Sequence, residues 1–378
     1  MEIYLVGGAV RDRLLNIPSK DKDFLVVGSS PEKMIDLGFK PIGKDFPVFL
    51  HPKTNEEYAL ARTEKKIAAG HKGFEFYASP DVSLEDDLRR RDITINAIAV
   101  DSFNNYIDPY GGINDIKKKI IRHVSPSFEE DPLRVLRVAR FQAKLPSFTI
   151  NDETMLLMKK IVLGDEICHL SAERIMGELI KGMEHKDAFS MLNVLDQCNA
   201  LNIIFPAIAF TKNKAKVKTI FNCANKYDLS SNRRLLLFLL SVNFEINSIS
   251  SNIHNNTSVL NLPSESKKII TLMQRYTEKL ILFADLYVEE QLDMLCTFDF
   301  FRRSHIVIEC MELIGLILEG SELDNAPLLR GKSLILSYLD ILAENKIIVD
   351  TAMTGEQIKN KLYAERLSLL EKLKNRQP

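Results

Sequence analysis

A pair of glycines, followed at a short distance by two alternating aspartates, is the feature that most constrains the fold of this chain. Gly7 and Gly8 close one short apolar run, and Asp21 and Asp23 open the next. Short apolar runs bounded by glycine and polar turns predict β-strands. Because successive side chains of a strand point to opposite faces, Asp21 and Asp23 are expected to share one face.

The two aspartates predict a site for a divalent cation. Carboxylates held so close repel each other, and a cation between them removes that repulsion. Oxygen ligands suit Mg²⁺, which takes part of its shell from substrate phosphates. The pair alone also fits solvated or turn carboxylates, so the prediction depends on the order of the motifs. Glu57, in the predicted strand 56–60, is a possible third ligand, and an exposed strand residue without this role fits the pattern equally well.

The glycine pair predicts a phosphate contact. Gly7 and Gly8 lie between a predicted strand and a helical segment, where bare backbone N–H groups can approach a phosphate closely. Arg11, one turn further along, would add a charge-assisted hydrogen bond. A lone glycine pair is more often only a turn, so this interpretation also requires the aspartates that follow.

Several segments together resemble the class II tRNA nucleotidyltransferases and the bacterial poly(A) polymerases. The first is LVGGAVRDRLL followed by KDKDFLVVG, and the others contain an RRD segment, a D-P-x-x-G-x-x-D segment, an E-D-x-x-R motif and the start of a later helix. In order, these others are residues 84–97, 108–116, 130–141 and 170–175. The resemblance covers roughly the first 200 residues and fades beyond residue 206.

The resemblance implies an α+β protein with a mixed-sheet nucleotidyltransferase head of the polymerase-β type, followed by an all-helical neck, body and tail. The expected head is 1–138, the neck is 139–205 and the body and tail, which would bind tRNA, are 206–378. The residues agree with this division, because short β-type runs dominate as far as about residue 130. Apolar residues at spacings of three and four then predict helices from Asp131 onward.

The resemblance also implies the activity of a CCA-adding enzyme with a gammaproteobacterial-type head. Such an enzyme adds C, C and A to the 3′ end of tRNA from CTP and ATP without a nucleic-acid template, and it releases pyrophosphate. Asp21 and Asp23 would be the catalytic residues and the ligands of two Mg²⁺ ions. The matching nucleotide-binding positions would be Gly8, Arg11, Arg91, Asp92, Asp131, Arg134, Arg137 and Arg140.

Asp131 and Arg134 match the pair that the family uses in place of a template. Cytosine and adenine present an amino donor beside a ring-nitrogen acceptor, whereas uracil and guanine present a carbonyl beside an N–H donor. A carboxylate next to a guanidinium therefore accepts C and A and rejects U and G. Since the two residues are three apart at the predicted start of a helix, we expect them to be neighbours on its surface. A flexible basic loop over residues 63–73 favours complete CCA addition.

Close relatives carry a second site, a phosphohydrolase built on His-Asp pairs. None of the seven histidines of this chain is followed by Asp, and residues 235–243, in the corresponding segment, are apolar. We therefore expect phosphodiesterase and phosphatase activity to be absent. The formal net charge of -1 requires any RNA contact to be local. Candidates in the body, which could equally form a solvated face, are Lys212, Lys214, Lys216, Lys218, Arg233 and Arg234.

Three alternatives remain open. A poly(A) polymerase shares every head motif, and a catalytically silent RNA-binding protein fits the loss of the second site. A D-x-D glycosyltransferase is disfavoured because Asp131 and Arg134 would then have no role. Five scattered cysteines, no signal-peptide pattern and no apolar run of membrane-spanning length predict a cytoplasmic protein without membrane contact. No obligate protein partner is evident.

Overall fold

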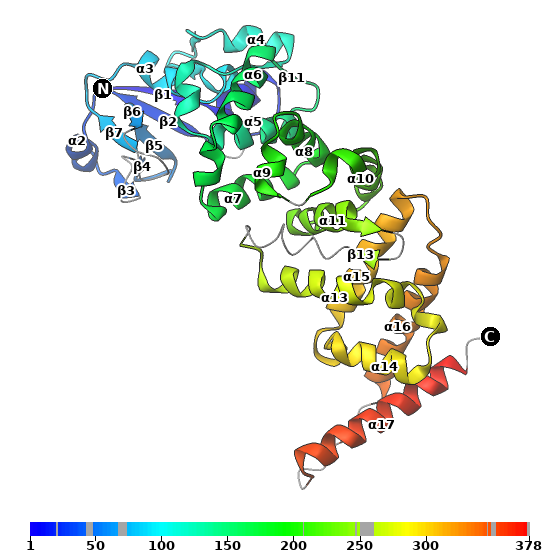
Figure 1. Cartoon of the computed structure of the whole chain (residues 1–378). Helices are drawn as coiled ribbons and strands as arrows, with labels where there is room; N and C mark the ends of the chain where they lie inside the picture. Colours follow the sequence, from blue (N-terminus) through cyan, green and yellow to red (C-terminus); the bar gives the residue numbers. More distant parts are fainter. Residues whose placement is uncertain are drawn as a thin grey trace. The chain divides into compact units, whose positions relative to one another are not determined.

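The structure is a computed structural model that divides the chain into two compact units, Met1–Pro206 and Ala207–Pro378. It describes residues 1–19, 22–42, 48–66, 74–206, 208–245, 248–249, 261–345, 347–348 and 353–375. Asp21 and the centre of the predicted basic loop, residues 67–73, lie outside the described residues. Figure 1 labels the elements of each unit.

The N-terminal unit is built on a seven-stranded mixed sheet with the strand order β3-β4-β5-β2-β1-β8-β9. Its strands are β1 (Glu2–Val6), β2 (Asp23–Val27), β3 (Lys40–Ile42), β4 (Val48–Leu50), β5 (Glu57–Leu60), β8 (Ala99–Val100) and β9 (Tyr106–Ile107). Strands β2 and β5 run parallel, and the other neighbours are antiparallel. The strands predicted before the glycine pair and at Asp23 are confirmed.

Both faces of this sheet are covered, which explains why its central strands are almost continuously apolar. In β2, Leu25 packs into a cluster with Val6 and Leu88, while the next residue, Val26, packs into a second cluster with Met34. This alternation is the ordinary consequence of the strand pleat. The surrounding elements are α1 (Gly8–Leu14), α2 (Pro31–Asp36), β6 (Arg62–Lys66), β7 (Phe74–Ala78), α3 (Leu84–Arg89), η2 (Thr94–Asn96) and α4 (Gly112–Lys118).

Helices complete the N-terminal unit and pack against one another through their buried faces. They are η3 (Pro126–Glu130), α5 (Leu133–Lys144), α6 (Asp152–Leu163), η4 (Glu166–His169), α7 (Ala172–Met183), α8 (Ala188–Gln197) and α9 (Ala200–Ile204). Helix α5 packs against α7 and α8. The expected neck is not purely helical, because β11 (Thr149–Ile150) pairs in parallel with β10 (Ile120–Ile121).

Among its described residues, the regular structure of the C-terminal unit is helical apart from a two-residue pairing of β12 (Phe244–Glu245) with β13 (Ser248–Ile249). Its helices are α10 (Phe210–Ala224), α11 (Ser231–Asn243), α13 (Ser264–Ile281), η5 (Phe283–Asp285), α14 (Val288–Thr297), α15 (Phe300–Gly320), α16 (Ala326–Glu344) and α17 (Gly355–Lys374). Helix α11 is buried without interruption from Arg234 to Asn243, as expected for a helix that is apolar on all sides.

The last helix, α17, begins with the predicted capping box. The side chain of Thr354 accepts a hydrogen bond from the backbone N–H of Gln357, and the Gln357 side chain accepts one from the backbone N–H of Thr354. Within the described part of the chain, no helix combines the length and the apolar character that crossing a membrane would require.

Candidate functional site

A cavity of about 620 Å³ opens in the N-terminal unit where β1, β2 and β5 approach α1, η2 and α5. Among the described residues, four carboxylates line it: Asp23, Glu57, Asp92 and Asp131. Eight arginines line it as well: Arg11, Arg62, Arg90, Arg91, Arg134, Arg137, Arg140 and Arg174. This excess of fixed positive charge in a concave site attracts a polyanionic ligand.

One group of carboxylates lies at the start of two neighbouring strands. Asp23 is the first residue of β2 and is the register partner of Glu57, the first residue of the parallel strand β5. Both are exposed and line the cavity. The backbones of adjacent strands lie about 4.8 Å apart, so carboxylates at one register can share a cation. Within the described residues, no three His, Cys, Asp or Glu side chains form a potential metal site.

The glycine pair lets charged groups approach the backbone. Gly7 has a φ of 73°, between the end of β1 and the start of α1. A Cβ at this position would lie 3.0 Å from Nη1 of Arg91 and 3.8 Å from Oδ2 of Asp23. A Cβ at Gly8 would lie 3.4 Å from Nη2 of Arg11. The predicted turn between a strand and a helix is therefore confirmed, with a guanidinium and a carboxylate beside it.

Arg11 is a buried residue of α1 whose guanidinium is held by Asp12 and Asn96. Its Nε donates to Oδ1 of Asp12 at 2.8 Å, and its Nη1 donates to Oδ1 of Asn96 at 2.6 Å. Asp12 also pairs with Lys144 of α5 at 2.9 Å. The guanidinium of Arg11 lies 5.3 Å from the ring centroid of Phe141. These contacts fix Arg11 at the wall of the cavity.

Asp92 is buried and accepts four hydrogen bonds from protein groups. Its Oδ1 accepts from the Ile93 N–H at 2.9 Å and from Nδ2 of Asn96 at 3.1 Å, while Oδ2 accepts from Nε of Arg137 at 2.8 Å. The fourth donor is Nη2 of Arg137, at 2.7 Å from Oδ2. Burial alone would raise the pKa of Asp92, but Arg137, Asn96 and Arg134 together hold it well below its ordinary value. Asp92 is therefore ionised at neutral pH and orients Arg137.

The two arginines before Asp92 are held by a carboxylate that the sequence interpretation missed. Asp87, which is fully buried, pairs with Nη2 of Arg91 at 3.1 Å and also with Arg90. Nη1 of Arg91 donates to the Asn96 carbonyl at 3.3 Å, and Nε of Arg90 donates to the Arg62 carbonyl at 2.9 Å. The spacings of three and four from Asp87 on a helix were the available signal.

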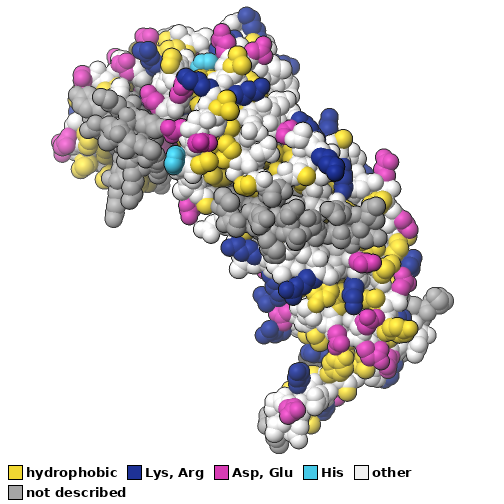
Figure 2. Space-filling model, viewed as in Figure 1, with side chains coloured by type: hydrophobic (Ala, Val, Ile, Leu, Met, Phe, Trp, Pro, Cys, Tyr) yellow, Lys and Arg dark blue, Asp and Glu magenta, His cyan; other side chains and the backbone are white. Residues whose placement is uncertain are grey.

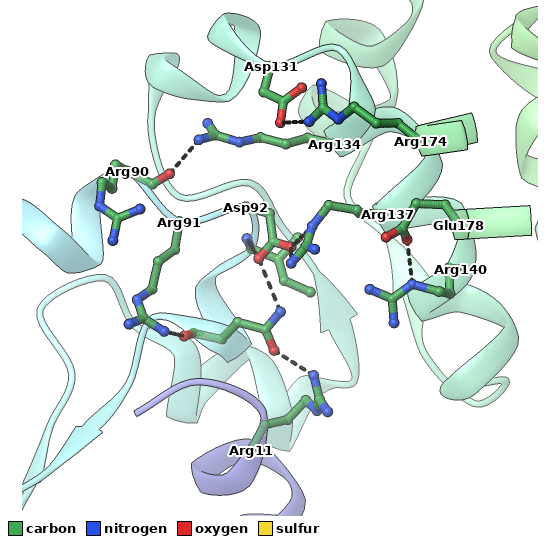
Figure 3. Close-up of polar contacts among 12 residues, drawn as sticks. Arg11, Arg90, Arg91, Asp92, Asp131, Arg134, Arg137, Arg140, Arg174 and Glu178 are labelled. Carbon is green, nitrogen blue, oxygen red and sulfur yellow. Dashed lines mark hydrogen bonds and ion pairs between the residues drawn. The ribbon is translucent and has the colours of Figure 1, made fainter. Parts of the chain in front are cut away.

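The structure corrects the expected arrangement of Asp131 and Arg134. Asp131 precedes the helix in an extended conformation and accepts from Nη2 of Arg174, a residue of α7, at 2.9 Å. Its Oδ1 also accepts from the N–H of Leu133 at 3.1 Å. Arg134 donates to the carbonyls of Arg90, at 2.7 Å, and of Ser127. Both residues line the cavity, but these partners orient them separately, as Figure 3 shows.

The reason for this correction is local. Asp131 is followed by Pro132, and a residue before proline is driven out of the helical region by the proline ring. Asp131 accordingly has φ -118° and ψ 105°, and α5 begins at Leu133. The interpretation that placed both residues on the surface of one helix was therefore wrong for Asp131.

Helix α5 continues the arginine stripe into the cavity. Arg137 binds Asp92, and Nε of Arg140 binds Oε2 of Glu178, a buried residue of α7, at 2.6 Å. Phe141 lies under these cations, with its ring centroid 4.5 Å from the guanidinium of Arg140 and 6.0 Å from that of Arg137. Each cation–π contact of this kind contributes roughly 0.5–2 kcal/mol.

Besides Asp87, other residues of this site were not predicted as site residues, among them Asn96, Phe141, Arg174 and Glu178. Arg174 and Glu178 lie four apart on α7, and each holds a cavity residue that comes from the α5 region. Their spacing places them on one face of a helix, but nothing local indicates which helix they meet. That information comes only from the packing of α7 on α5.

The basic residues expected to meet RNA in the C-terminal unit are only partly available. Lys216 donates to the Phe244 carbonyl at 2.8 Å, and burial lowers the pKa of its amine. Arg233 pairs with Glu309 and Glu312, and Arg234 is buried. Lys212 and Lys218 are exposed. Figure 2 shows basic and acidic side chains interspersed on the face in view, so neither sign of charge covers that face.

Two family models match parts of the first 211 residues. Residues 3–122 match the poly A polymerase head domain, and residues 147–211 match the probable RNA and SrmB-binding site of polymerase A. A CCA-adding enzyme from Coxiella burnetii is 58% identical over 208 residues, which are 55% of this chain and 55% of that protein. A multifunctional CCA protein from Methylobacillus flagellatus is 56% identical over 208 residues, 55% of this chain and 51% of that protein. The match thus spans about half the length of these curated relatives.

Solved structures extend the likeness to the whole fold. A CCA-adding enzyme in its apo form II has a TM-score of 0.69 at 23% identity, over 99% of this chain and 88% of that chain. The Thermotoga maritima CCA-adding enzyme complexed with tRNA has a TM-score of 0.65 at 22% identity, over 100% and 88%. The predicted α+β fold, a mixed-sheet head followed by helices, is confirmed. This chain therefore carries a match to the poly A polymerase head domain and is similar to the CCA-adding enzymes, in sequence over its first half and in fold throughout.

Proposed function

We propose that this chain adds C, C and A to the 3′ end of tRNA from CTP and ATP without a nucleic-acid template. The observation that carries the proposal is that one cavity brings together the carboxylates Asp23 and Glu57, a set of arginines, and the pair Asp131 and Arg134. The first group suits metal-assisted phosphoryl chemistry and the last suits base selection. The names of the relatives and the tRNA, ATP and CTP complexes of similar structures support the same activity.

The carboxylate end fits a divalent ion, which we propose to be Mg²⁺. Asp21 and Asp23 are the expected ligands, and Glu57, the register partner of Asp23 at the start of β5, would be the third. An ion held there would assist attack by the tRNA 3′-hydroxyl and neutralise charge on the triphosphate. Because Gly7 has no side chain, Arg91 and Asp23 approach the backbone closely at this end of the cavity.

The arginines would bind and orient the nucleotide. A triphosphate brings several negative charges, and guanidinium groups bind phosphate oxygens through charge-assisted hydrogen bonds. Arg11 and Arg91 lie beside the glycine pair, and Arg137 and Arg140 lie on α5. Their carboxylate and amide partners hold the guanidinium groups in place before the ligand arrives, which reduces the entropy lost on binding.

Asp131 and Arg134 would select the base. A bound C or A would give its amino group to Asp131 and accept from Arg134, whereas U or G would leave these groups unpaired. Each unpaired buried group costs about 1–3 kcal/mol. Arg174 holds the Asp131 carboxylate, and two backbone carbonyls hold the Arg134 guanidinium, so the pair is presented in a fixed orientation.

We propose that the C-terminal unit binds tRNA and has no phosphohydrolase activity. Helix α11, where relatives would place histidine ligands, is a buried apolar helix. His305 lies elsewhere, on α15, with Nε2 3.5 Å from a carboxylate oxygen of Glu265; His254 lies outside the described residues. Phosphohydrolase sites need several imidazoles and carboxylates around their metals. The exposed Lys212 and Lys218 are the basic candidates of α10 for sequence-independent contact with the tRNA backbone in the cytoplasm.

The second candidate is a poly(A) polymerase, which the head-domain match favours equally. The test incubates the protein with tRNA lacking CCA, tRNA ending in C-C, and an unrelated RNA, each with labelled CTP, ATP, UTP or GTP. Addition of C, C and A to the first and of A alone to the second supports our proposal. Long A tails on every RNA would refute it. Absence of any addition would favour a catalytically silent RNA-binding protein.

A further inference from the structure

Asn96 occupies the centre of the network that surrounds the cavity. It is the last residue of η2, it is buried, and it lines the cavity. Its Oδ1 accepts from Nη1 of Arg11 at 2.6 Å, and its Nδ2 donates to Oδ1 of Asp92 at 3.1 Å. Its backbone carbonyl accepts from Nη1 of Arg91 at 3.3 Å. One residue thus contacts three of the residues proposed to serve the nucleotide: Arg11, Arg91 and Asp92.

The side-chain amide of Asn96 can point in only one direction here. The guanidinium of Arg11 offers donors and no acceptor, while the ionised carboxylate of Asp92 offers acceptors and no donor. The bridging side chain must therefore present an acceptor to α1 and a donor to Asp92 at the same time. An amide of this length does so, whereas leucine of similar size offers neither group and aspartate offers only acceptors.

This bridge closes a continuous polar chain between two helices distant in sequence. The chain runs from Asp12 and Arg11 on α1, through Asn96, to Asp92 and then to Arg137 on α5. Arg11 flanks the glycine pair, whereas Arg137 lies on the helix that begins beside Asp131 and Arg134. Asn96 is the neutral link between these two charged pairs.

We infer that Asn96 is a positioning residue that couples the phosphate-binding side of the cavity to its base-binding side. The inference rests on the proposed function. Without the amide, Arg11 loses an acceptor and Asp92 loses a donor, so the guanidinium groups of Arg11 and Arg137 are held less firmly relative to each other, although Asp12 still links Arg11 to Lys144 of α5. Loss of this relative placement weakens nucleotide binding and blurs selection among bases.

The test compares Asn96→Leu and Asn96→Asp with matched variants of Asn105. The Asn105 amide also donates to an aspartate, Oδ2 of Asp101 at 2.9 Å, but in an exposed turn away from the cavity. For each protein we would measure kcat and KM for CTP and ATP, the ratio of C to U incorporation, and the thermal unfolding midpoint. Partial misfolding lowers the active fraction, and hence kcat, without changing KM or selectivity.

We expect both Asn96 variants to raise KM for CTP and ATP by about tenfold or more and to lower the ratio of C to U incorporation. The Asn105 variants leave both quantities at the wild-type value. Unchanged KM and selectivity in folded Asn96→Leu would overturn the inference. If the wild-type protein incorporates no nucleotide, the proposed function fails. The coupling is then tested by calorimetric CTP binding, where equal affinity of wild type and Asn96→Leu would refute it.

An exchange of the two groups gives an independent measurement. In the double variant Asn96→Asp/Asp92→Asn, the amide at position 92 can donate to the carboxylate at position 96, which still accepts from Arg11. We expect KM for CTP to be lower in the double variant than in Asn96→Asp alone, by about threefold or more. If the change in KM of the double variant equals the product of the changes in the two single variants, the two positions are not directly coupled.

Discussion

Asp23 and Glu57 face each other as register partners on the parallel strands β2 and β5, each as the first residue of its strand. This relationship joins two carboxylates that are far apart in the sequence and places both at the cavity. It gives Glu57 a structural reason to act with Asp23, where the sequence alone left an exposed strand residue equally acceptable.

Glu57→Gln should weaken metal-dependent nucleotide addition. Replacing the carboxylate with an amide removes a negative charge beside Asp23, so we expect the Mg²⁺ concentration for half-maximal activity to rise by about tenfold or more. The matched control is Glu56→Gln, because Glu56 lies next in the chain but accepts from Thr54 and pairs with Lys22. Equal Mg²⁺ requirements in both variants would show that Glu57 is not a metal ligand.

Arg174→Ala should impair base selection more than it impairs folding. The variant removes the cation that holds Asp131, so the carboxylate gains freedom and we expect increased incorporation of U and G relative to C and A. Lys160→Ala is the control. It breaks the exposed ion pair between Lys160 of α6 and Glu129 of η3, which is worth about 1 kcal/mol or less. Competition assays with mixed nucleotides measure the selectivity. Wild-type selectivity in Arg174→Ala would contradict a positioning role.

The sequence predicted the local elements well because their causes are local. The strands around Gly7 and after Asp23 follow from apolar runs and glycine, and the start of α17 follows from the capping pair Thr354 and Gln357. The start of α5 was mispredicted although its cause is also local, since Pro132 forces Asp131 into an extended conformation. That interpretation used the three-residue spacing of Asp131 and Arg134 and did not take the effect of Pro132 into account.

Gly7→Ala should disturb the site, whereas Gly111→Ala should affect only stability. Both glycines have φ near 72°, so a methyl group strains the backbone at either, by about 1–2 kcal/mol at the left-handed Gly111 and by about 1–3 kcal/mol at Gly7, whose ψ is -137°. Only at Gly7 does the added Cβ meet a cavity residue, Nη1 of Arg91 at 3.0 Å, while at Gly111 nothing lies within 4 Å. We expect KM for CTP to rise in Gly7→Ala alone. Similar KM values in both variants would argue against close packing of Arg91 at Gly7.

The pair of Asp92 with Arg137 should contribute to stability above pH 4 and lose its contribution below it. Burial disfavours the Asp92 carboxylate, but Arg137, Asn96 and Arg134 lower its pKa below the unfolded value near 4. A lowered pKa adds stability above the unfolded pKa, and this stability falls as the pH decreases toward the folded pKa. Urea unfolding of Asp92→Asn should therefore differ most from wild type near pH 7.

The expected size of this difference lies between the roughly 1 kcal/mol of a surface pair and the 3–5 kcal/mol of a buried one, because Asp92 is buried and Arg137 is partly exposed. The difference should shrink steadily between about pH 4 and pH 2. A difference that stays constant over that range would show that the variant acts through packing and not through the charge of Asp92.

Much of the site could not be predicted, because it is made by contacts between distant segments. Arg174 reaches Asp131 only because α7 packs on α5. Arg233 forms ion pairs with Glu309 and Glu312 of another helix, which makes it less available to RNA. Side-chain spacing shows which residues share one face of a helix, but it does not show which other element packs against that face. It was therefore easier to predict which residues belong to the site than to predict which partner each of them contacts.

Incorporation of nucleotides into tRNA lacking CCA tests the central claim most directly. Wild type, Asp23→Asn and Asp131→Ala are each incubated with that tRNA, Mg²⁺ and all four nucleotides, and the 3′ ends are sequenced. We predict C-C-A ends for wild type, no addition for Asp23→Asn, and ends that include U or G for Asp131→Ala. Addition by Asp23→Asn at the wild-type rate, or wild-type ends that are not C-C-A, would contradict this account.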